Sequence, residues 1–351
     1  IGVRLVGSEM CIRDSGAHGT IGPSAYRSPA VCPAPRPSFP DAMTQPSSSS
    51  AAEPAADLSG DLPGDLQARI RELWLYPIKS CAGIQVEQAL LIETGLEFDR
   101  AWMVVDEQGR FVTQRTAPRM ALIQPQLRRD DLVVRAPGML ALHLSLDTAE
   151  EPVRVQVWKD EVQAYDMGRL AAQWFSDFLG QTVRLVRFDP EQPRVSSPKW
   201  TGDDAGYVQF GDGYAVLVCT DAALTDLNRR LADGGHAPVD WRRFRPNVVI
   251  EALPGGEAID PHAEDYWREL TIATADGQAQ LRLVKPCTRC EIPNVDPATG
   301  EFGSEPNATL AGYRADSRME GAVTVGMNAI VTGGIEHLLK RGARVGVGLD
   351  F

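Results

Sequence analysis

The sequence lacks the features of a membrane protein or a nucleic-acid-binding protein. Its longest uninterrupted apolar run covers only residues 214–219 of 351, whereas a transmembrane helix needs about 20 such residues. Basic residues are outnumbered by acidic ones, 35 against 47, and the resulting net charge of −12 disfavours a phosphate backbone as the main partner. Aromatic residues make up 7% of the chain, too few for base-stacking platforms. We therefore expect neither nucleic-acid binding nor membrane insertion.

Cysteine and histidine are also scarce. Six cysteines in a chain of this length do not form a disulfide framework, and only Cys287 and Cys290 stand at motif spacing. The five histidines show no paired spacing, which argues against a zinc metalloprotease or histidine-triad site. No basic stretch followed by an apolar one marks a secretory signal. We expect a cytoplasmic protein.

Residues 1–66 differ in composition from the rest of the chain. They hold nine of the 25 prolines and the serine run at residues 47–50, and they show no apolar periodicity. Such a segment cannot bury enough apolar surface to offset its chain entropy, so we expect a disordered tail. Met43 is a natural start position, which makes residues 1–42 candidates for non-native sequence.

From residue 67 onward, short apolar runs alternate with turn residues, as is typical of β-rich proteins. Strands are expected first at residues 71–76, 101–106, 111–115, 120–127, 132–135, 140–146 and 153–158, and later at 246–250, 270–274, 279–284, 323–331 and 344–349. Asp276-Gly277 predicts a tight hairpin between the strands at 270–274 and 279–284.

Two segments have helical periodicity instead. Residues 168–179 predict a helix whose apolar face carries Leu170, Trp174, Phe178 and Leu179. A second helix is expected to begin at Thr220, whose side chain would cap it. The expected fold class is α+β and β-rich, with an N-terminal β-barrel-like domain over residues 67–185 and a second β-barrel domain with a few helices over residues 186–351.

The pair Cys287 and Cys290 is the sharpest chemical feature. A thioredoxin-like dithiol would need the pair at the start of a helix, but Pro293 soon follows. A structural zinc site would need four ligands, and the nearest candidates, Cys81 and Cys219, are isolated in the sequence. Both alternatives are therefore disfavoured, while two simply packed cysteines remain open.

Arg289 lies between the two cysteines, and its charge would favour a thiolate. A soft thiolate suits a thiophilic metal. The functional interpretation is a single thiolate ligand to a metal that a cofactor carries.

Basic residues at strand edges form a second candidate group in this acidic chain. Lys79, Arg100 and Arg245 suit an anionic ligand, because arginine offers a bidentate fork and lysine a point charge. Thr220 adds a helix N-terminus, which also favours an anion. Taken singly, each residue also has a structural alternative. Lys79 could be a solvated turn residue and Arg100 the ion-pair partner of Asp99. Arg245 could be a surface strand end and Thr220 only a helix cap.

Several motifs carry a resemblance to a known family. They are YPIKSC at residues 76–81, DR at 99–100, FRPNVVI at 244–250, ED with a following tryptophan at 264–267, and CTRCEIPNVD with TG at 287–300. With these motifs the chain from about residue 69 to 351 resembles MOSC-domain proteins that carry an N-terminal MOSC β-barrel domain, the group of the mitochondrial amidoxime-reducing component and its bacterial relatives.

This resemblance implies a molybdenum cofactor, Mo-molybdopterin, with Cys290 as the catalytic thiolate ligand to molybdenum and Cys287 as a cysteine that is not a ligand. The cofactor-binding positions that it implies are Lys79, Ser80 and Arg100 in residues 67–185, the MOSC N-terminal domain, and Thr220, Arg245, Asn247, Thr288, Arg289 and Asn328 in residues 186–351, the MOSC domain.

The implied activity is reduction of small N-hydroxylated compounds such as amidoximes, hydroxylamines and hydroxylated base analogues, a detoxification reaction. Bacterial relatives often end in an iron–sulfur domain, and the chain has no such cysteine motif before Phe351. We therefore expect a separate ferredoxin or flavoprotein reductase to supply the electrons.

The resemblance leaves a second class of function open. MOSC modules are also proposed sulfur carriers for metal–sulfur cluster assembly, in which case Cys290 would bear a persulfide. Broad family descriptions add pyridoxal phosphate binding, which needs a Schiff-base lysine. The five lysines, at positions 79, 159, 199, 285 and 340, have no supporting motif.

Overall fold

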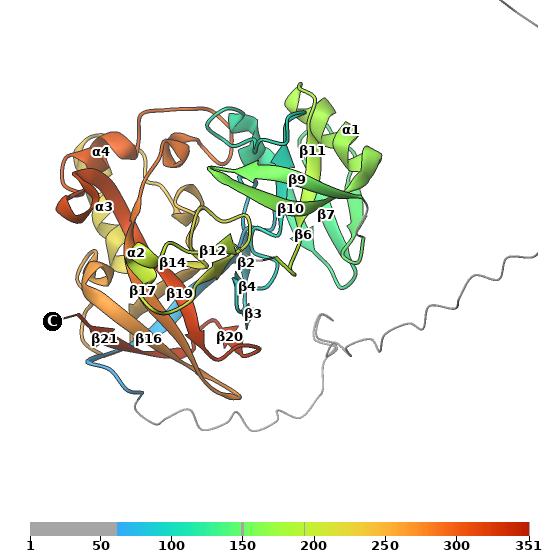
Figure 1. Cartoon of the computed structure of the whole chain (residues 1–351). Helices are drawn as coiled ribbons and strands as arrows, with labels where there is room; N and C mark the ends of the chain where they lie inside the picture. Colours follow the sequence, from blue (N-terminus) through green and yellow to red (C-terminus); the bar gives the residue numbers. More distant parts are fainter. Residues whose placement is uncertain (1–61, 149–150, 193, 351) are drawn as a thin grey trace, which may run out of the picture. The chain divides into compact units, whose positions relative to one another are not determined.

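The computed structural model describes residues 62–148, 151–192 and 194–350, and within these ranges the chain is β-rich, as predicted (Figure 1). The tail expected over residues 1–66 lies outside the described residues up to residue 61. Residues 62–66 contact the folded part of the chain, since Leu62 is buried and Asp65 N donates to Val347 O at 2.7 Å. In the described part, no helix is both long and apolar enough to cross a membrane.

Seven strands close into a barrel. In order around it they are β14 (Val216–Thr220), β15 (Val248–Ala252), β1 (Leu66–Leu75), β21 (Arg344–Leu349), β16 (Trp267–Thr274), β17 (Gly277–Thr288) and β19 (Ala322–Gly333). Pairing of β14 with β19 completes the circle, and only β14 and β15 run parallel. Two short strands extend the sheet, β2 (Ile84–Val86) beside β1 and β18 (Ala315–Asp316) beside β19.

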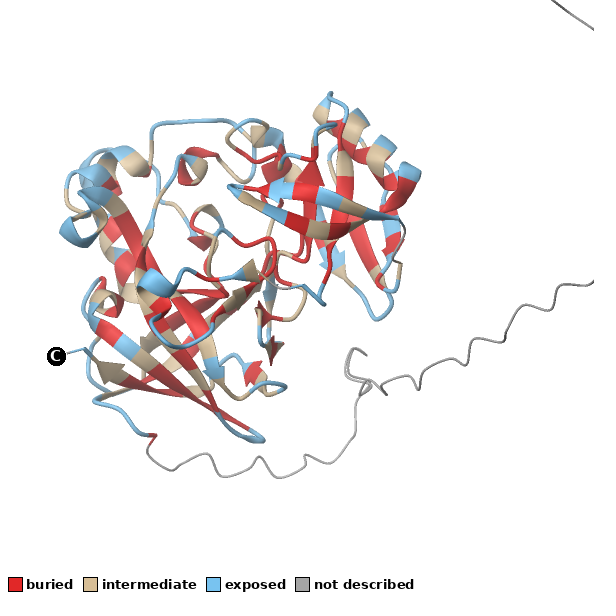
Figure 2. Ribbon diagram, viewed as in Figure 1, coloured by how far each residue is buried: buried red, intermediate tan, exposed pale blue. Residues whose placement is uncertain are grey.

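Alternation of side chains builds two cores on these strands. On β14, Val216 and Val218 point into the barrel, where they pack with aliphatic residues of all six other barrel strands. Leu217 and Cys219 point outward and pack against helix α3 (Asp221–Asp233). Burial of each large aliphatic side chain contributes about 2 kcal/mol to stability. Figure 2 shows the buried positions running along the barrel strands.

The first part of the chain forms two further sheets around a shared core. One has the order β5 (Trp102–Val105), β11 (Arg184–Phe188), β10 (Asp160–Asp166), β9 (Pro152–Val157), and the other β6 (Gln124–Leu127), β7 (Asp131–Arg135), β8 (Leu142–Ser145). Helix α1 (Gly168–Leu179) fills this core with Ala171, Trp174, Phe175 and Phe178.

The remaining elements are short. They are β3 (Gln88–Ile92) with β4 (Gly95–Leu96) and β20 (Leu338–Lys340), β12 (Arg194–Val195) with β13 (Tyr207–Val208), the helices α2 (Pro198–Thr201) and α4 (Asn307–Ala311), and the 3₁₀ helices η1 (Pro118–Leu122), η2 (Trp241–Arg243), η3 (Ala263–Tyr266), η4 (Ile292–Asn294) and η5 (Ser317–Met319).

Several local expectations are wrong. Residues 111–115 form no strand beyond a bridge from Phe111 to Val105, and residues 120–127 begin as the 3₁₀ helix η1 because Pro118 opens it. Strands β10 and β11 were not expected. Leu170 is 71% exposed, since the buried face of α1 runs through the residues named above. The hairpin of β16 and β17 turns one residue earlier than expected, because Thr274 pairs with Gly277.

Strand β1 falls within the range expected for the first domain, yet it pairs with β15 and β21 in the barrel. The turn after β1 therefore leaves the barrel and leads directly into the first part of the chain. Residues 76–81 therefore follow directly on a barrel strand, while Ile78 and Cys81 of this segment are buried in the core of the first part of the chain.

Candidate functional site

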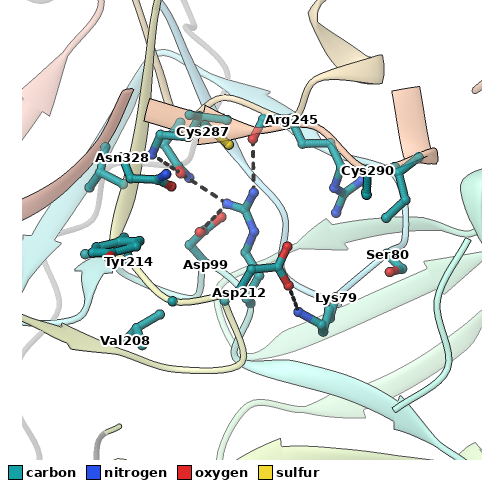
Figure 3. Close-up of a pocket in the computed structure, with 18 of the residues that line it drawn as sticks. Lys79, Ser80, Asp99, Val208, Asp212, Tyr214, Arg245, Cys287, Cys290 and Asn328 are labelled. Atoms are coloured by element: carbon teal, nitrogen blue, oxygen red, sulfur yellow. Dashed lines mark hydrogen bonds and ion pairs between the residues drawn. The ribbon is translucent and has the colours of Figure 1, made fainter. Parts of the chain in front are cut away.

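One pocket receives residues from both parts of the chain (Figure 3). Its wall comes from the segment after β1, the segment before β5, the loop between β13 and β14, the segment before β15, the end of β17 and the middle of β19. Nine of the ten site residues expected from the sequence line it: Lys79, Ser80, Arg100, Arg245, Asn247, Thr288, Arg289, Cys290 and Asn328. These residues are up to 249 positions apart in the chain and meet only in the folded protein.

Thr220 is the exception, because the fold does not bring it to the pocket wall. It is fully buried and its Oγ1 donates to Glu264 Oε2 at 2.6 Å. Helix α3 does begin at Asp221, but the Thr220 side chain makes no capping hydrogen bond. The expected cap and the expected anion contact are therefore both replaced by a bond to a buried carboxyl group.

Lys79 places a buried ammonium group at the pocket. Its Nζ donates to Phe210 O at 2.8 Å and to Asp212 Oδ1 at 2.5 Å. Burial lowers the pKa of Lys79, while the Asp212 charge opposes that shift. The Asp212 side chain is 70% exposed, so the lysine's partner can be replaced by another anion without uncovering a core residue.

Two guanidinium groups stack on Tyr76. Arg100 Cζ lies 4.4 Å and Arg245 Cζ 4.2 Å from the ring centroid. Arg100 bonds Asp99 and donates from Nη2 to Arg245 O at 3.0 Å. Arg245 donates from Nη1 to Cys81 O, and its buried Nη2 has no hydrogen-bond partner among the residues described.

Burial, and next the charge of Arg100, lower the pKa of Arg245 to about 10. The group stays protonated at neutral pH. A buried cation with an unused donor costs free energy unless an anion or polar group meets it. The pocket therefore offers an unused buried donor and a positive charge to a ligand.

Asn247 fixes Arg100 relative to the barrel. Its Oδ1 accepts from Leu217 N at 3.1 Å and from Arg100 Nη1 at 3.2 Å, while its Nδ2 donates to Trp74 O at 3.2 Å. Asn328, on β19, donates from Nδ2 to Lys285 O at 3.2 Å. Both amides thus tie the pocket wall to barrel strands.

The two neighbouring cysteines have different surroundings. Arg289 donates from Nη1 to Cys287 Sγ at 3.0 Å and from Nη2 to Phe244 O at 2.8 Å. Cys290 is the one exposed cysteine among the four described cysteines. Its thiol is free to bind a ligand, whereas the Cys287 thiol already has a cationic partner.

The described residues contain no group of three or more His, Cys, Asp or Glu side chains placed to hold a metal ion. A structural zinc site formed by the protein alone is therefore unsupported there. A metal bound through Cys290 would need its other ligands from a cofactor.

Backbone strain is concentrated at this pocket. Four residues of its wall have φ between 51° and 66°, in the left-handed region that residues other than glycine avoid: Ser80, Arg100, Trp158 and Arg245. Such residues cost about 1 to 3 kcal/mol each and tend to occur at functional sites.

Part of the pocket wall was not expected from the sequence. Asp212 lies in the Gly-Asp-Gly segment that reads as an ordinary turn, and Trp158 and Arg115 belong to segments expected only as strands. No local pattern marks these residues, because their neighbours in the pocket are distant in the chain. The one feature of the sequence that could have marked Asp212 as a site residue is its position between two glycines.

Comparison with known proteins gives two family matches. Residues 67–182 match the model of the MOSC N-terminal beta barrel domain, and residues 205–348 match the model of the MOSC domain. Together these ranges contain every site residue expected from the sequence.

Three curated proteins illustrate the similarity. Mitochondrial amidoxime reducing component 2 of Bos taurus is 36% identical over 255 residues, which cover 70% of this chain and 72% of that protein. Mitochondrial amidoxime-reducing component 1 of Mus musculus is 37% identical, with 70% and 71% covered. Molybdenum cofactor sulfurase of Oryza sativa subsp. japonica is 31% identical over 302 residues, covering 79% of this chain but 35% of that protein.

Proposed function

The chain belongs to the MOSC-domain family, its MOSC domain preceded by a MOSC N-terminal β-barrel domain, and from this we propose that it is a molybdenum-cofactor-dependent oxidoreductase that reduces N-hydroxylated compounds. The observation that carries the proposal is the exposed Cys290 thiol in a pocket with buried cations. The names of the similar amidoxime-reducing components suggest the substrate class.

The residues fit such a cofactor. Molybdenum accepts soft thiolate, and Cys290 offers one that no described side chain occupies. The cofactor's phosphate needs charge-assisted donors, and Arg245 Nη2 is a buried donor without a described partner. Lys79 can pass from the exposed Asp212 to a phosphate oxygen.

When bound, the cofactor supplies the two-electron chemistry and the protein supplies binding and orientation. Cys290 gives one ligand, while Arg100 and Arg245 neutralise the anionic end. Asn247 holds Arg100 in place, which restricts where the anion can sit. Reduction of an N–OH group to N–H consumes two electrons and two protons and releases water. We propose a separate ferredoxin or flavoprotein reductase as the electron donor.

The test compares the two cysteines. Full-length protein from a host that makes molybdenum cofactor should contain stoichiometric molybdenum and reduce benzamidoxime with reduced viologen as donor, and NADH alone should not support turnover. Cys290→Ala should lose turnover and the thiolate contribution to the molybdenum X-ray absorption spectrum. Cys287→Ala is the matched control and should keep both, because Arg289 already engages that thiol. Equal effects of the two substitutions, or zinc in place of molybdenum, would overturn the single-thiolate assignment.

A sulfur carrier is the second candidate, because an exposed thiol also suits a persulfide and one relative is named molybdenum cofactor sulfurase. Molybdenum-loaded protein without turnover, together with transferable sulfur on Cys290, would favour it. Pyridoxal phosphate is not part of the proposal, since Lys79, the lysine of the pocket wall, is assigned here to the phosphate of the molybdenum cofactor.

A further inference from the structure

Trp158 stands at a position that favours glycine. It is the first of the two residues that turn β9 into β10, because Val157 pairs with Asp160. Its φ of 55° is in the left-handed region, where a bulky aromatic residue is strained. The side chain is not used to fill a core either, since the residue is 42% exposed. Folding alone gives no reason for a tryptophan here.

The contacts of Trp158 direct its ring to the proposed active site. Its ring centroid lies 5.0 Å from that of Phe111 at 59°, and Arg115 Cζ lies 4.6 Å from it. Its Nε1 donates to Asp212 Oδ1 at 3.2 Å, the same oxygen that Lys79 binds. We call Phe111, Trp158 and Arg115 the aromatic rim.

The aromatic rim belongs to the pocket that holds Cys290. Trp158 and Arg115 both line that pocket, and Lys79 Nζ lies 5.5 Å from the Phe111 ring centroid. A half-exposed indole at a pocket wall offers a flat apolar surface to a ligand. Its hydrogen bond to Asp212 and its contacts with Phe111 and Arg115 hold that surface in one orientation, which lowers the entropy cost of stacking.

We propose that Trp158 is a substrate-positioning residue that selects planar, conjugated N-hydroxylated compounds over aliphatic ones, an inference that rests on the proposed reductase function. A planar substrate stacks on the indole while its N–OH group points into the pocket. An aliphatic amidoxime has no ring to stack and gains nothing from Trp158. Arg115, stacked on the same indole, places a positive charge there and favours the neutral amidoxime over the protonated amidine product.

The test uses cofactor-loaded full-length protein and two probes, benzamidoxime and acetamidoxime. Trp158→Ala should lower kcat/KM for benzamidoxime about tenfold, mostly through KM, and change that for acetamidoxime by less than about twofold. Trp158→Phe should restore most of the selectivity. Trp200→Ala is the matched control, because Trp200 is outside the pocket wall and contacts Lys199 and Lys285 instead.

Two readouts separate positioning from a structural role. Trp158→Gly relieves the left-handed strain, so it should unfold at a temperature close to wild type while losing the preference for benzamidoxime. Calorimetric binding of both probes to the loaded protein, without an electron donor, should show the same preference and the same loss in Trp158→Ala.

The outcomes distinguish this inference from the reductase proposal. Turnover of both probes with an unchanged ratio in Trp158→Ala would overturn the role of Trp158 and leave the reductase standing. If the loaded protein turned over neither probe but still bound benzamidoxime in a Trp158-dependent way, the reductase proposal would be overturned and the role of Trp158 in binding would stand. Neither turnover nor selective binding would overturn both.

Discussion

Two buried groups near the N-terminus of α3, His262 and Glu264, should make opposite contributions to the pH dependence of stability. Glu264 is fully buried, and this burial raises its pKa from 4.5 to about 7. Thr220 Oγ1 donates to its Oε2, while its Oε1 has no hydrogen-bond partner among the described residues. His262 is also buried, and burial, followed by the charge of Arg314, lowers its pKa from 6.5 to about 4.

The signs follow from which state binds the proton. Between about pH 4.5 and 7 the folded chain keeps a proton on Glu264 that the unfolded chain releases, so this group's contribution to stability is lost as the pH rises. Between about pH 4 and 6.5 the unfolded chain binds a proton on His262 that the folded chain does not, so stability rises with pH. At about 1.4 kcal/mol per pH unit, each contribution amounts to about 3 kcal/mol, and in the wild type they largely cancel.

Single substitutions should expose each contribution. Glu264→Gln keeps an acceptor for Thr220 and removes the ionisable group, so its unfolding free energy relative to wild type should increase by about 3 kcal/mol from pH 4.5 to 7. His262→Asn suits the left-handed backbone at φ 63° and should show a relative decrease of about 3 kcal/mol from pH 4 to 6.5.

Urea unfolding of the full chain, followed by circular dichroism at closely spaced pH values, measures these differences. Using differences from wild type removes the contributions of the other titrating groups. Flat difference curves, or curves of the same sign for the two variants, would refute the assigned pKa directions. The double variant should return to a nearly flat curve.

Two further predictions concern packing and thiol access. Gly326→Ala should destabilise the barrel by more than about 3 kcal/mol, because the added Cβ would lie 2.5 Å from Cys219 Sγ and the residue has a φ of 77°. Gly342→Ala is the control: it has a similar φ of 80° but open space around it in the described structure, so it should cost only about 1 kcal/mol. Thermal unfolding of both variants measures the difference. Peptide mapping after brief treatment with iodoacetamide should find Cys290 labelled and Cys81 and Cys219 unlabelled until the protein unfolds, because burial raises the pKa of Cys81 to about 12 and that of Cys219 well above its usual value. Labelling of Cys219 in the native protein would contradict the packing described.

Local patterns predicted those elements whose information lies within a few neighbouring residues. The helix start expected at Thr220 matches α3, which begins at Asp221, and the turn at Asp276 predicted the hairpin of β16 and β17 to within one residue. Of the apolar face expected for α1, Trp174 and Phe178 are buried as predicted, whereas Leu170 is exposed, because periodicity alone does not fix the edge of the face that meets the core.

The candidate site shows the same division. The positions of two cysteines near a strand end and of basic residues after other strands could be predicted from the sequence, since these are properties of short segments. The exposure of Cys290, the bond from Arg289 to Cys287 and the bond from Thr220 to Glu264 all follow from the tertiary fold. These outcomes depend on pairings between distant strands, such as β1 with β15 and β21, and the free energy of such non-local contacts cannot be read from a short stretch of sequence.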